Sequence, residues 1–178
     1  ALLTRAQAGD AMAARTLVRR LSPRAHALAW RMLGDAALAE DVVQDALEKL
    51  FKVRQFRGAS RLSTYFHTMV SRLCMDICRS QKSLNFDSDL VEDMSMTEWV
   101  PGTDFQLAQH DQAGQIQAAL QALPPRQRLA ISLWAYHDYT VLEISDVLQV
   151  DRNAADQLLH RAKAKLRKKL EDLHEYAR

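Results

Sequence analysis

The sequence predicts an all-α protein made of two small helical domains. Glycine and proline are scarce, at 5 and 4 of 178 residues, and residues that favour helices are abundant. Apolar residues recur with the period of an amphipathic helix in most segments. The charge is also divided: residues 1–84 carry a net +7, residues 85–110 carry six acidic and no basic residues, and residues 111–178 carry +1. We therefore expect two helical units, each with its own core, joined by an acidic linker.

Four helices are expected in the first unit. Apolar residues predict helices over 1–21 and 23–33, separated by Ser22-Pro23, with Gly34 ending the second. A third helix should run from Asp35 to about residue 53, and a fourth from Thr64 to about Lys82. The fourth should bury Phe66, Met69, Val70, Leu73 and Ile77, and present outward Thr68, Ser71, Arg72, Met75 and Arg79.

The third helix has an acidic strip opposite its apolar stripe. The strip consists of Asp41, Gln44, Asp45 and Glu48, and the apolar stripe of Val42, Val43, Ala46, Leu47, Leu50 and Phe51. A docking surface for a basic partner helix would have this pattern. A solvated face without a partner would have it too.

A basic loop that contains an aromatic residue separates the third and fourth helices. It holds Phe56, Arg57, Gly58 and Ser60, and the basic outer face of the fourth helix follows it. Aromatic rings that stack on bases, next to guanidinium groups that follow phosphates, are typical of a single-strand binding surface. A surface loop over an ordinary core helix is the alternative.

The two cysteines, Cys74 and Cys78, are four residues apart on one predicted helix. Their Cβ atoms should lie ~5–6 Å apart, which is too far for a disulfide. Unpaired thiols suit a reducing cytoplasm, and neither a membrane-spanning run nor a signal peptide is visible in the sequence. Together with His67 the thiols lack a fourth metal ligand, so structural thiols are favoured and no metal is expected.

The second unit should end in a helix-turn-helix. Helices are expected over 111–123 and 126–136, the latter with Leu129, Ala130, Leu133 and Trp134 as apolar residues. Thr140 and Glu143 have capping-box spacing, and Asp151 is a favourable N-cap for a last helix. That helix should bury Ala155, Leu158, Leu159, Ala162 and Leu166, and its basic outer side would suit a DNA major groove. An amphipathic hairpin with a solvated face is the alternative.

Three segments, taken in order, resemble one family. They are LGDAALAEDVVQDALEKLFK, then F-R-G-x-S followed by TYFHTMVSR, and finally LPPRQRLAISL with YTVLEISDVLQV and LLHRAKAKL. The chain resembles an extracytoplasmic-function (ECF) sigma factor of the sigma-70 family over nearly its whole length. The resemblance implies a sigma-2 helical bundle at residues 1–84, an acidic linker at 85–110, and a sigma-4 helix-turn-helix domain at 111–178.

The resemblance also implies roles for individual residues. The acidic strip would dock on the β′ subunit of RNA polymerase. Promoter DNA at the minus-ten element would meet Phe56, Arg57, Ser60, Tyr65, Arg72 and Arg79. The minus-thirty-five element would meet Arg152, Asn153, Asp156, Gln157, His160 and Arg161. The family usually has Trp near Tyr65, Asn near Arg72, and G-T-V-[KR]-S-R at 153–158, where this chain has NAADQL. Asp156 and Leu158 therefore imply an unusual minus-thirty-five preference, or weak reliance on that element.

The implied function is transcription initiation in the cytoplasm, with no cofactor and no chemistry of its own. The implied partners are the β and β′ subunits of core RNA polymerase, promoter DNA and an anti-sigma factor. The acidic linker would mimic RNA in the exit path, so replacing its acids with serine should change abortive initiation. No glycine-rich phosphate loop or nucleophile–base arrangement favours an enzyme. The alternatives are a stand-alone helix-turn-helix regulator with residues 1–84 as a sensor, and a module that only sequesters a partner.

Overall fold

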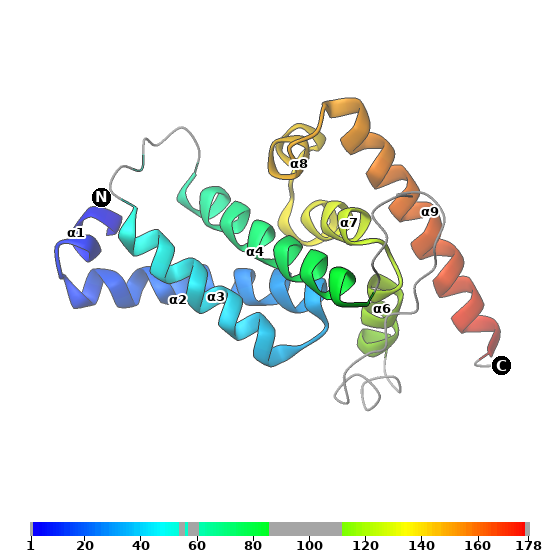
Figure 1. Ribbon diagram of the computed structural model, residues 1–178, viewed down its shortest axis with the longest axis horizontal. Helices are drawn as coiled ribbons and strands as arrows, with labels where there is room; N and C mark the ends of the chain where they lie inside the picture. Colours follow the sequence, from blue (N-terminus) through cyan, green and yellow to red (C-terminus); the bar gives the residue numbers. More distant parts are fainter. Residues whose placement is uncertain (1, 54–55, 57–60, 86–111, 177–178) are drawn as a thin grey trace.

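The computed structural model describes residues 2–53, 56, 61–85 and 112–176, and within these ranges every regular element is a helix. The N-terminal lobe contains α1 (Leu2–Gln7), α2 (Ala11–Leu33), α3 (Ala36–Lys52) and α4 (Leu62–Asn85). The C-terminal lobe contains α6 (Gln112–Gln121), α7 (Pro125–His137), α8 (Val141–Leu148) and α9 (Arg152–Tyr176). Helix α1 and the C-terminal end of α9 lie at opposite ends of the molecule (Figure 1). The all-α prediction is confirmed. The acidic residues of the expected linker lie outside the described residues.

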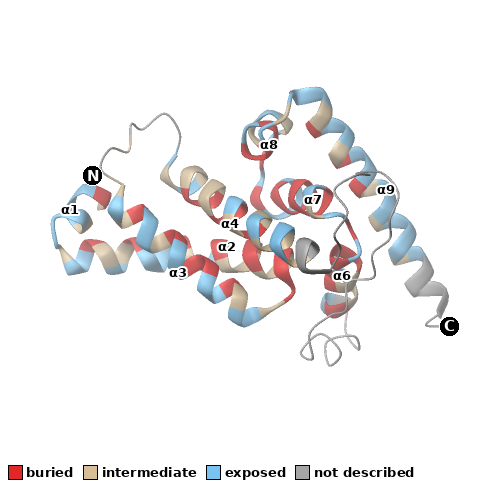
Figure 2. Cartoon of the chain, viewed as in Figure 1, coloured by how far each residue is buried: buried red, intermediate tan, exposed pale blue. Residues whose placement is uncertain are grey.

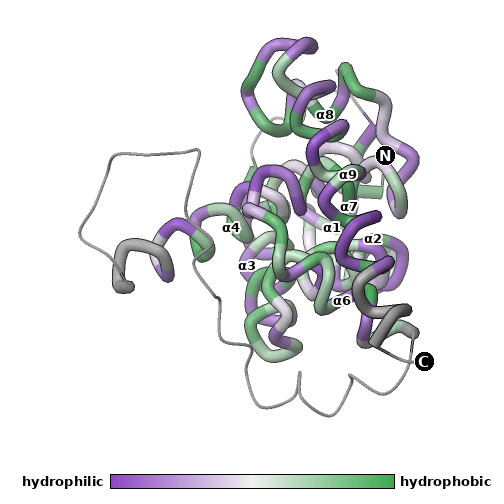
Figure 3. Tube along the Cα trace, turned by 90° about the vertical axis from the view of Figure 1, so that its right-hand side faces the viewer, coloured by the Kyte–Doolittle hydropathy of each residue, from purple (hydrophilic) through white to green (hydrophobic). Residues whose placement is uncertain are grey.

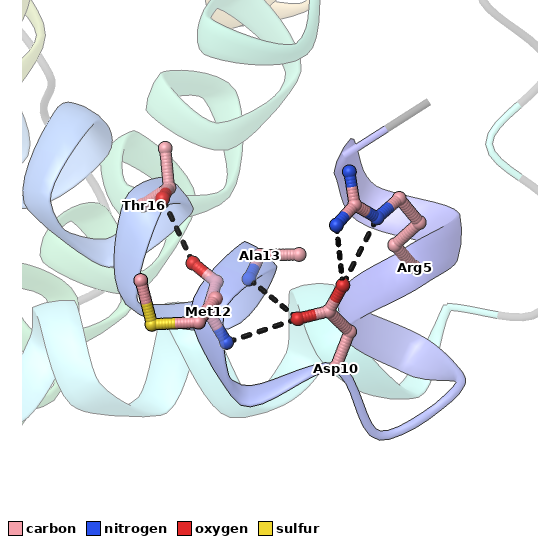
Figure 4. Close-up of polar contacts among 5 residues, drawn as sticks. All are labelled: Arg5, Asp10, Met12, Ala13 and Thr16. Carbon is pink, nitrogen blue, oxygen red and sulfur yellow. Dashed lines mark hydrogen bonds and ion pairs between the residues drawn. The ribbon is translucent and has the colours of Figure 1, made fainter.

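The break between the first two helices is the main correction to the predicted elements. It falls at Gly9 and Asp10 instead of Ser22-Pro23. Gly9 has a φ of 93°, and the Asp10 carboxylate accepts hydrogen bonds from the N–H groups of Met12 and Ala13 at 3.0 Å, as an N-cap (Figure 4).

Pro23 lies inside α2 without ending it. The proline removes one backbone hydrogen bond, but its side chain is exposed, so water can reach the carbonyl that loses its donor. The buried residues Leu17, Leu21, Ala25 and Leu28 continue past Pro23 on one face of the helix. Their packing against α3 and α4 keeps the helix continuous.

Buried residues of α2, α3 and α4 form one continuous core with Leu129, Leu133 and Ile144 of the C-terminal lobe, while a smaller cluster around Leu120 and Leu159 lies within the C-terminal lobe. The expectation that each unit has its own separate core is therefore wrong. The alternation of apolar and polar residues along each helix is visible in Figure 3.

The buried face of α4 differs from the predicted one. Ser71 was expected on the surface and is only 1% exposed. The buried side of α4 consists of Phe66, His67, Val70, Ser71 and Cys74. The reason is that α4 packs on α2 and α3 and also on α7 and α8 of the other lobe.

Helix α7 is the most enclosed helix of the C-terminal lobe, with most of its residues buried (Figure 2). It packs against α2, α4, α8 and α9. One predicted core residue is wrong: Trp134 is 44% exposed. None of the helices in the described part combines the length and apolar character needed to cross a bilayer.

The two lobes pack against each other along a seam at the C-terminal end of α2, where three side chains of the C-terminal lobe reach its last carbonyls. Gln117 donates a hydrogen bond to Trp30 O at 2.9 Å, and Gln121 donates to Arg31 O at 2.8 Å. Arg128 donates to Met32 O. Carbonyls at a helix C-terminus have no partner inside the helix, so the bonds to Arg31 O and Met32 O satisfy groups that would otherwise need water, while Trp30 O also accepts from the Gly34 N–H at 2.8 Å.

Candidate nucleic-acid interface

The acidic strip on α3 is fully exposed. Asp41, Gln44, Asp45 and Glu48 all lie on the solvent side of a helix whose opposite side buries Ala39, Val42, Val43, Ala46 and Leu50. Glu48 pairs with Lys52 at 3.2 Å, and both side chains remain largely exposed. Within the described ranges, Asp41 and Asp45 have no ion-pair partner in the chain. Two uncompensated carboxylates are therefore available to a basic partner.

An aromatic pair stands where the basic loop meets α4. The rings of Phe56 and Tyr65 are half-buried, with centroids 5.3 Å apart and planes inclined by 58°. This geometry is a favourable edge-inclined contact, and it holds Tyr65 beside the start of α4. Arg57 and Ser60, which were predicted to contact the same DNA, lie outside the described residues.

The outer face of α4 carries two exposed arginines of different character. Arg79 pairs with Asp76 at 3.2 Å, an (i, i+3) contact between exposed side chains. Arg72 has no such partner among the described residues. Because the charge of Arg79 is partly compensated, Arg72 is the better candidate for a phosphate or base contact.

The helix-turn-helix has the local structure that its sequence predicts. Thr140 caps α8, and the capping box is complete, with the Glu143 carboxylate accepting from Thr140 N–H at 2.8 Å. The turn passes through Gln149 in the left-handed conformation at φ 53°. Asp151 then accepts from Ala154 N–H at 2.8 Å at the start of α9. The predicted helix boundaries and caps are confirmed here.

All six predicted minus-thirty-five residues of α9 are exposed: Arg152, Asn153, Asp156, Gln157, His160 and Arg161. Ala155, Leu159 and Ala162 are buried on the opposite face. Arg152, Asn153 and Asp156 line a hollow of about 370 Å³ together with Val141 at the start of α8. The first turn of α9 therefore presents a basic, an amide and an acidic side chain side by side.

Replacing Thr140 with alanine should lower the free energy of unfolding by about 1 kcal/mol, because the variant removes an N-cap hydroxyl. The hydrogen bonds from the backbone and hydroxyl of Thr140 lower the pKa of the Glu143 carboxyl. The stabilisation from Glu143 is therefore present at neutral pH and is lost as the pH falls through the lowered pKa. Urea unfolding at pH 7 and at acid pH measures both effects. As a control, Thr16→Ala, which removes a mid-helix hydroxyl bonded to Met12 O, should change stability by less than about 0.5 kcal/mol.

The sequence did not predict a groove between α7 and α9. It has a volume of about 820 Å³ and is lined by Leu120, Ile131, Trp134, Ala135, Tyr136, Lys163, Leu166, Arg167, Leu170 and Glu171. The Lys163 ammonium lies 3.5 Å from the centre of the Trp134 ring, a cation–π contact. Trp134 looked like a core residue in the sequence. No signal in the sequence marked it as exposed, because it lies only about 40–60° around α7 from Ala130 and Ile131, which are buried.

The two cysteines lie in α4 and are free. Cys74 is buried and Cys78 is half-buried, and burial raises the pKa of both thiols. A raised pKa keeps a thiol protonated and unreactive. Among the described residues, no three His, Cys, Asp or Glu side chains are placed to hold a metal ion.

Comparison with known proteins assigns both lobes to one family. A family model of sigma-70 region 2 matches residues 17–84, and a model of sigma-70 region 4 matches residues 113–166. An ECF RNA polymerase sigma factor, SigE of Mycolicibacterium smegmatis, is 29% identical over 155 residues. Another, SigW of Bacillus subtilis, is 25% identical over 179 residues. The chain belongs to the ECF group of the sigma-70 family.

The alignments of this ECF sigma factor with its relatives span different shares of their lengths. The alignment with SigE spans 85% of this chain and 59% of SigE, and the alignment with SigW spans 93% and 92%. Among solved structures, a complex of CnrH with the cytosolic domain of CnrY has a TM-score of 0.69 at 20% identity, covering 96% of each chain. The sigma factor RpoE of Bartonella quintana, solved with the anti-sigma factor NepR, has a TM-score of 0.67 at 20% identity, covering 88% of this chain and 96% of RpoE. These structures share the fold.

The two segments that match the family models contain the exposed charged faces described above, one segment in each lobe of this ECF sigma factor. Region 2 includes α3 with the acidic strip, and α4 with Tyr65 and Arg72. Region 4 includes α7, α8 and the part of α9 that carries the exposed basic residues. The strip, the face of α4 and the face of α9 are all accessible in this arrangement of the lobes.

Proposed function

We propose that this chain is an alternative sigma factor that binds core RNA polymerase and directs it to promoters. The observation that carries the proposal is that both sigma-70 regions are present in order. Each region also presents its charged surface to solvent. The proposed division is a sigma-2 domain at 1–84, an acidic linker at 85–110 and a sigma-4 domain at 111–178.

The polymerase contacts are assigned to two surfaces of different chemistry. The acidic strip binds a basic helical surface of β′, where Asp41 and Asp45 gain the partners that they lack within the described chain. The groove between α7 and α9 is apolar at its base and basic at Lys163 and Arg167. It binds the flap of the β subunit, an amphipathic partner that suits such a groove.

The promoter contacts follow from the exposed basic and aromatic groups. Tyr65 and Phe56 offer rings for base stacking, worth ~1–3 kcal/mol per base, which offsets part of the few kcal/mol that unstacking a base costs. Arg72 neutralises phosphate. On α9, Arg152 and Arg161 contact phosphate, and Asp156 accepts a hydrogen bond from the amino group of cytosine. The protein itself performs no bond-breaking chemistry.

An anti-sigma factor is a further partner, which a structural neighbour supports, because RpoE was solved with the anti-sigma factor NepR. Because the proposed function is transcription, the proposed location of the chain is the cytoplasm. An inhibitor of this kind would hold the sigma factor away from polymerase until a signal releases it.

In-vitro transcription with purified core polymerase tests the function directly. The full chain, freed of any inhibitor, should start RNA synthesis from a subset of promoters in a genomic pool. A stand-alone regulator would instead bind specific duplex DNA tightly without polymerase and start no transcript. Failure to initiate at every promoter in the pool rules the proposal out.

Replacing Arg161 with alanine should weaken promoter binding by the holoenzyme and make it less dependent on salt. A phosphate contact releases a counterion on binding, so its loss reduces the slope of log K against log salt by about 1. Binding titrations between about 50 and 200 mM salt measure the slope. The control is Arg15→Ala, which removes an exposed arginine of α2 and should leave the slope unchanged.

A further inference from the structure

The centre of the seam holds two buried histidines and a buried tyrosine from different lobes. His67 belongs to α4, His137 ends α7, and Tyr139 lies between α7 and α8. The two imidazole rings meet edge to face, with centroids 4.9 Å apart. The Tyr139 hydroxyl lies 3.5 Å from His67 Nδ1. At the centre of the seam, the lobes therefore contact each other through three side chains that can form hydrogen bonds or titrate.

Among the described residues, neither ring nitrogen of His137 has a hydrogen-bond partner, although both are buried. A neutral imidazole tolerates this position at the cost of unmade hydrogen bonds. An imidazolium would add a buried charge with two unsatisfied donors. The site therefore accepts His137 only in its neutral form.

The charged groups around the two histidines oppose protonation as well. From α2, Arg24 and Arg31 act on His137, and Arg24 acts on His67. Arg61, just before α4, interacts electrostatically with Glu143 of α8, and Glu143 acts on Tyr139. Asp138 is exposed. Burial first, followed by His67 and then the two arginines, lowers the pKa of His137 to about 4. Burial first and Arg24 second lower the pKa of His67 to about 4.

The closed arrangement of the lobes cannot reach both promoter elements at once. Elements named minus ten and minus thirty-five are centred about 25 base pairs apart, or about 85 Å along the duplex at 3.4 Å per pair. A compact chain of this length is about 40 Å across. Simultaneous binding therefore requires the lobes to separate at the seam, and this consequence rests on the proposed sigma-factor function.

We propose that His67, His137 and Tyr139 form a proton-sensitive latch that keeps the two lobes together near neutral pH and releases the C-terminal lobe in acid. Opening exposes both imidazoles to water, where the ordinary histidine pKa is about 6.5. The open form therefore binds more protons between pH 6.5 and 4, and the closed form loses stability as the pH falls through that window. At pH 5 each histidine, taken alone, should shift the ratio of closed to open molecules by about thirtyfold.

Small-angle X-ray scattering of the full chain tests the latch without any polymerase. The radius of gyration should rise between pH 7.5 and 5.0, while far-UV circular dichroism shows that the helices persist. In the same samples, NMR titration of the histidines in the unmodified protein should place two of them well below pH 6.5. An unchanged radius, or two buried histidines titrating near 6.5 while the lobes stay together, overturns the proposal.

Two variants separate the latch from the rest of the seam. His137→Phe cannot be protonated, so its radius should respond less to acid. Gln117→Ala loses the hydrogen bond to Trp30 O and should open more at every pH, with the acid response retained. His26→Asn, a half-buried histidine of α2 outside the cluster, is the matched control and should behave as the parent does. Should His137→Phe fail to fold, the NMR titration of the parent still decides the question.

An acid response of His137→Phe equal to that of the parent contradicts the latch. This result is distinct from failure of the proposed function. A chain that opens in acid but never starts transcription with core polymerase would retain the latch and lose the sigma-factor assignment. A chain that starts transcription but has the same radius of gyration at both pH values would retain the sigma-factor assignment and lose the latch.

Discussion

Replacing Asp45 with arginine should weaken binding of core RNA polymerase by roughly 30-fold or more. Asp45 is an exposed carboxylate at the centre of the acidic strip and has no ion-pair partner in the described part of the chain. Removing one member of a desolvated charge pair costs about 2–5 kcal/mol, and introducing a like charge adds repulsion. Fluorescence anisotropy of labelled sigma factor titrated with core polymerase measures the affinity.

The matched control for this variant is Glu40→Arg. Glu40 lies on the same helix, is also exposed, and undergoes the same change of charge, but it lies about 140° around the helix axis from Asp45, beside Gln44 at the edge of the strip. The control should retain most of the affinity, and both variants should keep the helical circular dichroism of the parent. Equal losses for Glu40→Arg and Asp45→Arg would mean that net charge, and not the strip, sets the affinity.

Replacing Arg128 with methionine should lower the free energy of unfolding by about 3–5 kcal/mol. The buried guanidinium donates to Met32 O, to Gln121 Oε1 at 2.5 Å, to Gln121 O at 2.8 Å and to Leu123 O at 3.0 Å. It therefore joins the end of α6, the start of α7 and the end of α2. Methionine fills a similar volume but leaves these buried acceptors without donors, and each such acceptor costs about 1–3 kcal/mol before the structure relaxes.

Urea denaturation of the parent and the Arg128→Met variant at pH 7.5 measures this loss. Burial lowers the pKa of Arg128, yet an arginine remains charged at any accessible pH, so the loss should not vary between pH 6 and 8. The control is Arg126→Met, an exposed arginine two residues earlier, which should change stability by less than about 0.5 kcal/mol. Similar losses at both positions would show that the carbonyl contacts contribute little.

Local signals in the sequence predicted three of the helix starts, although the start of α2 at Asp10 was missed. Asp35, Thr140 and Asp151 each cap a helix as expected, because a cap depends only on residues two or three positions away. The capping box of α8 is the clearest case, since both of its hydrogen bonds join Thr140 and Glu143.

Predictions about which face of a helix is buried were less secure. Ser71 was expected on the surface and is buried, while Trp134 was expected in the core and is exposed. Pro23 was expected to end a helix and lies inside one. In each case the outcome depends on a neighbouring helix that is distant in sequence, and the period of a single helix does not say how many neighbours it has.

The sequence alone determined the family, the helical class, the order of the two units and the exposed charged faces of α3 and α9. The helical class and the exposed faces follow from composition and periodicity, which are local properties, and the family follows from the resemblance of three segments to its motifs. The tertiary structure alone decided how the lobes meet. The bond from Arg128 to Met32 O spans 96 residues, and the contact of Tyr139 with His67 spans 72. No local pattern marks such pairs, because the period of a helix indicates which of its faces is apolar and not which residue of a distant segment lies against it.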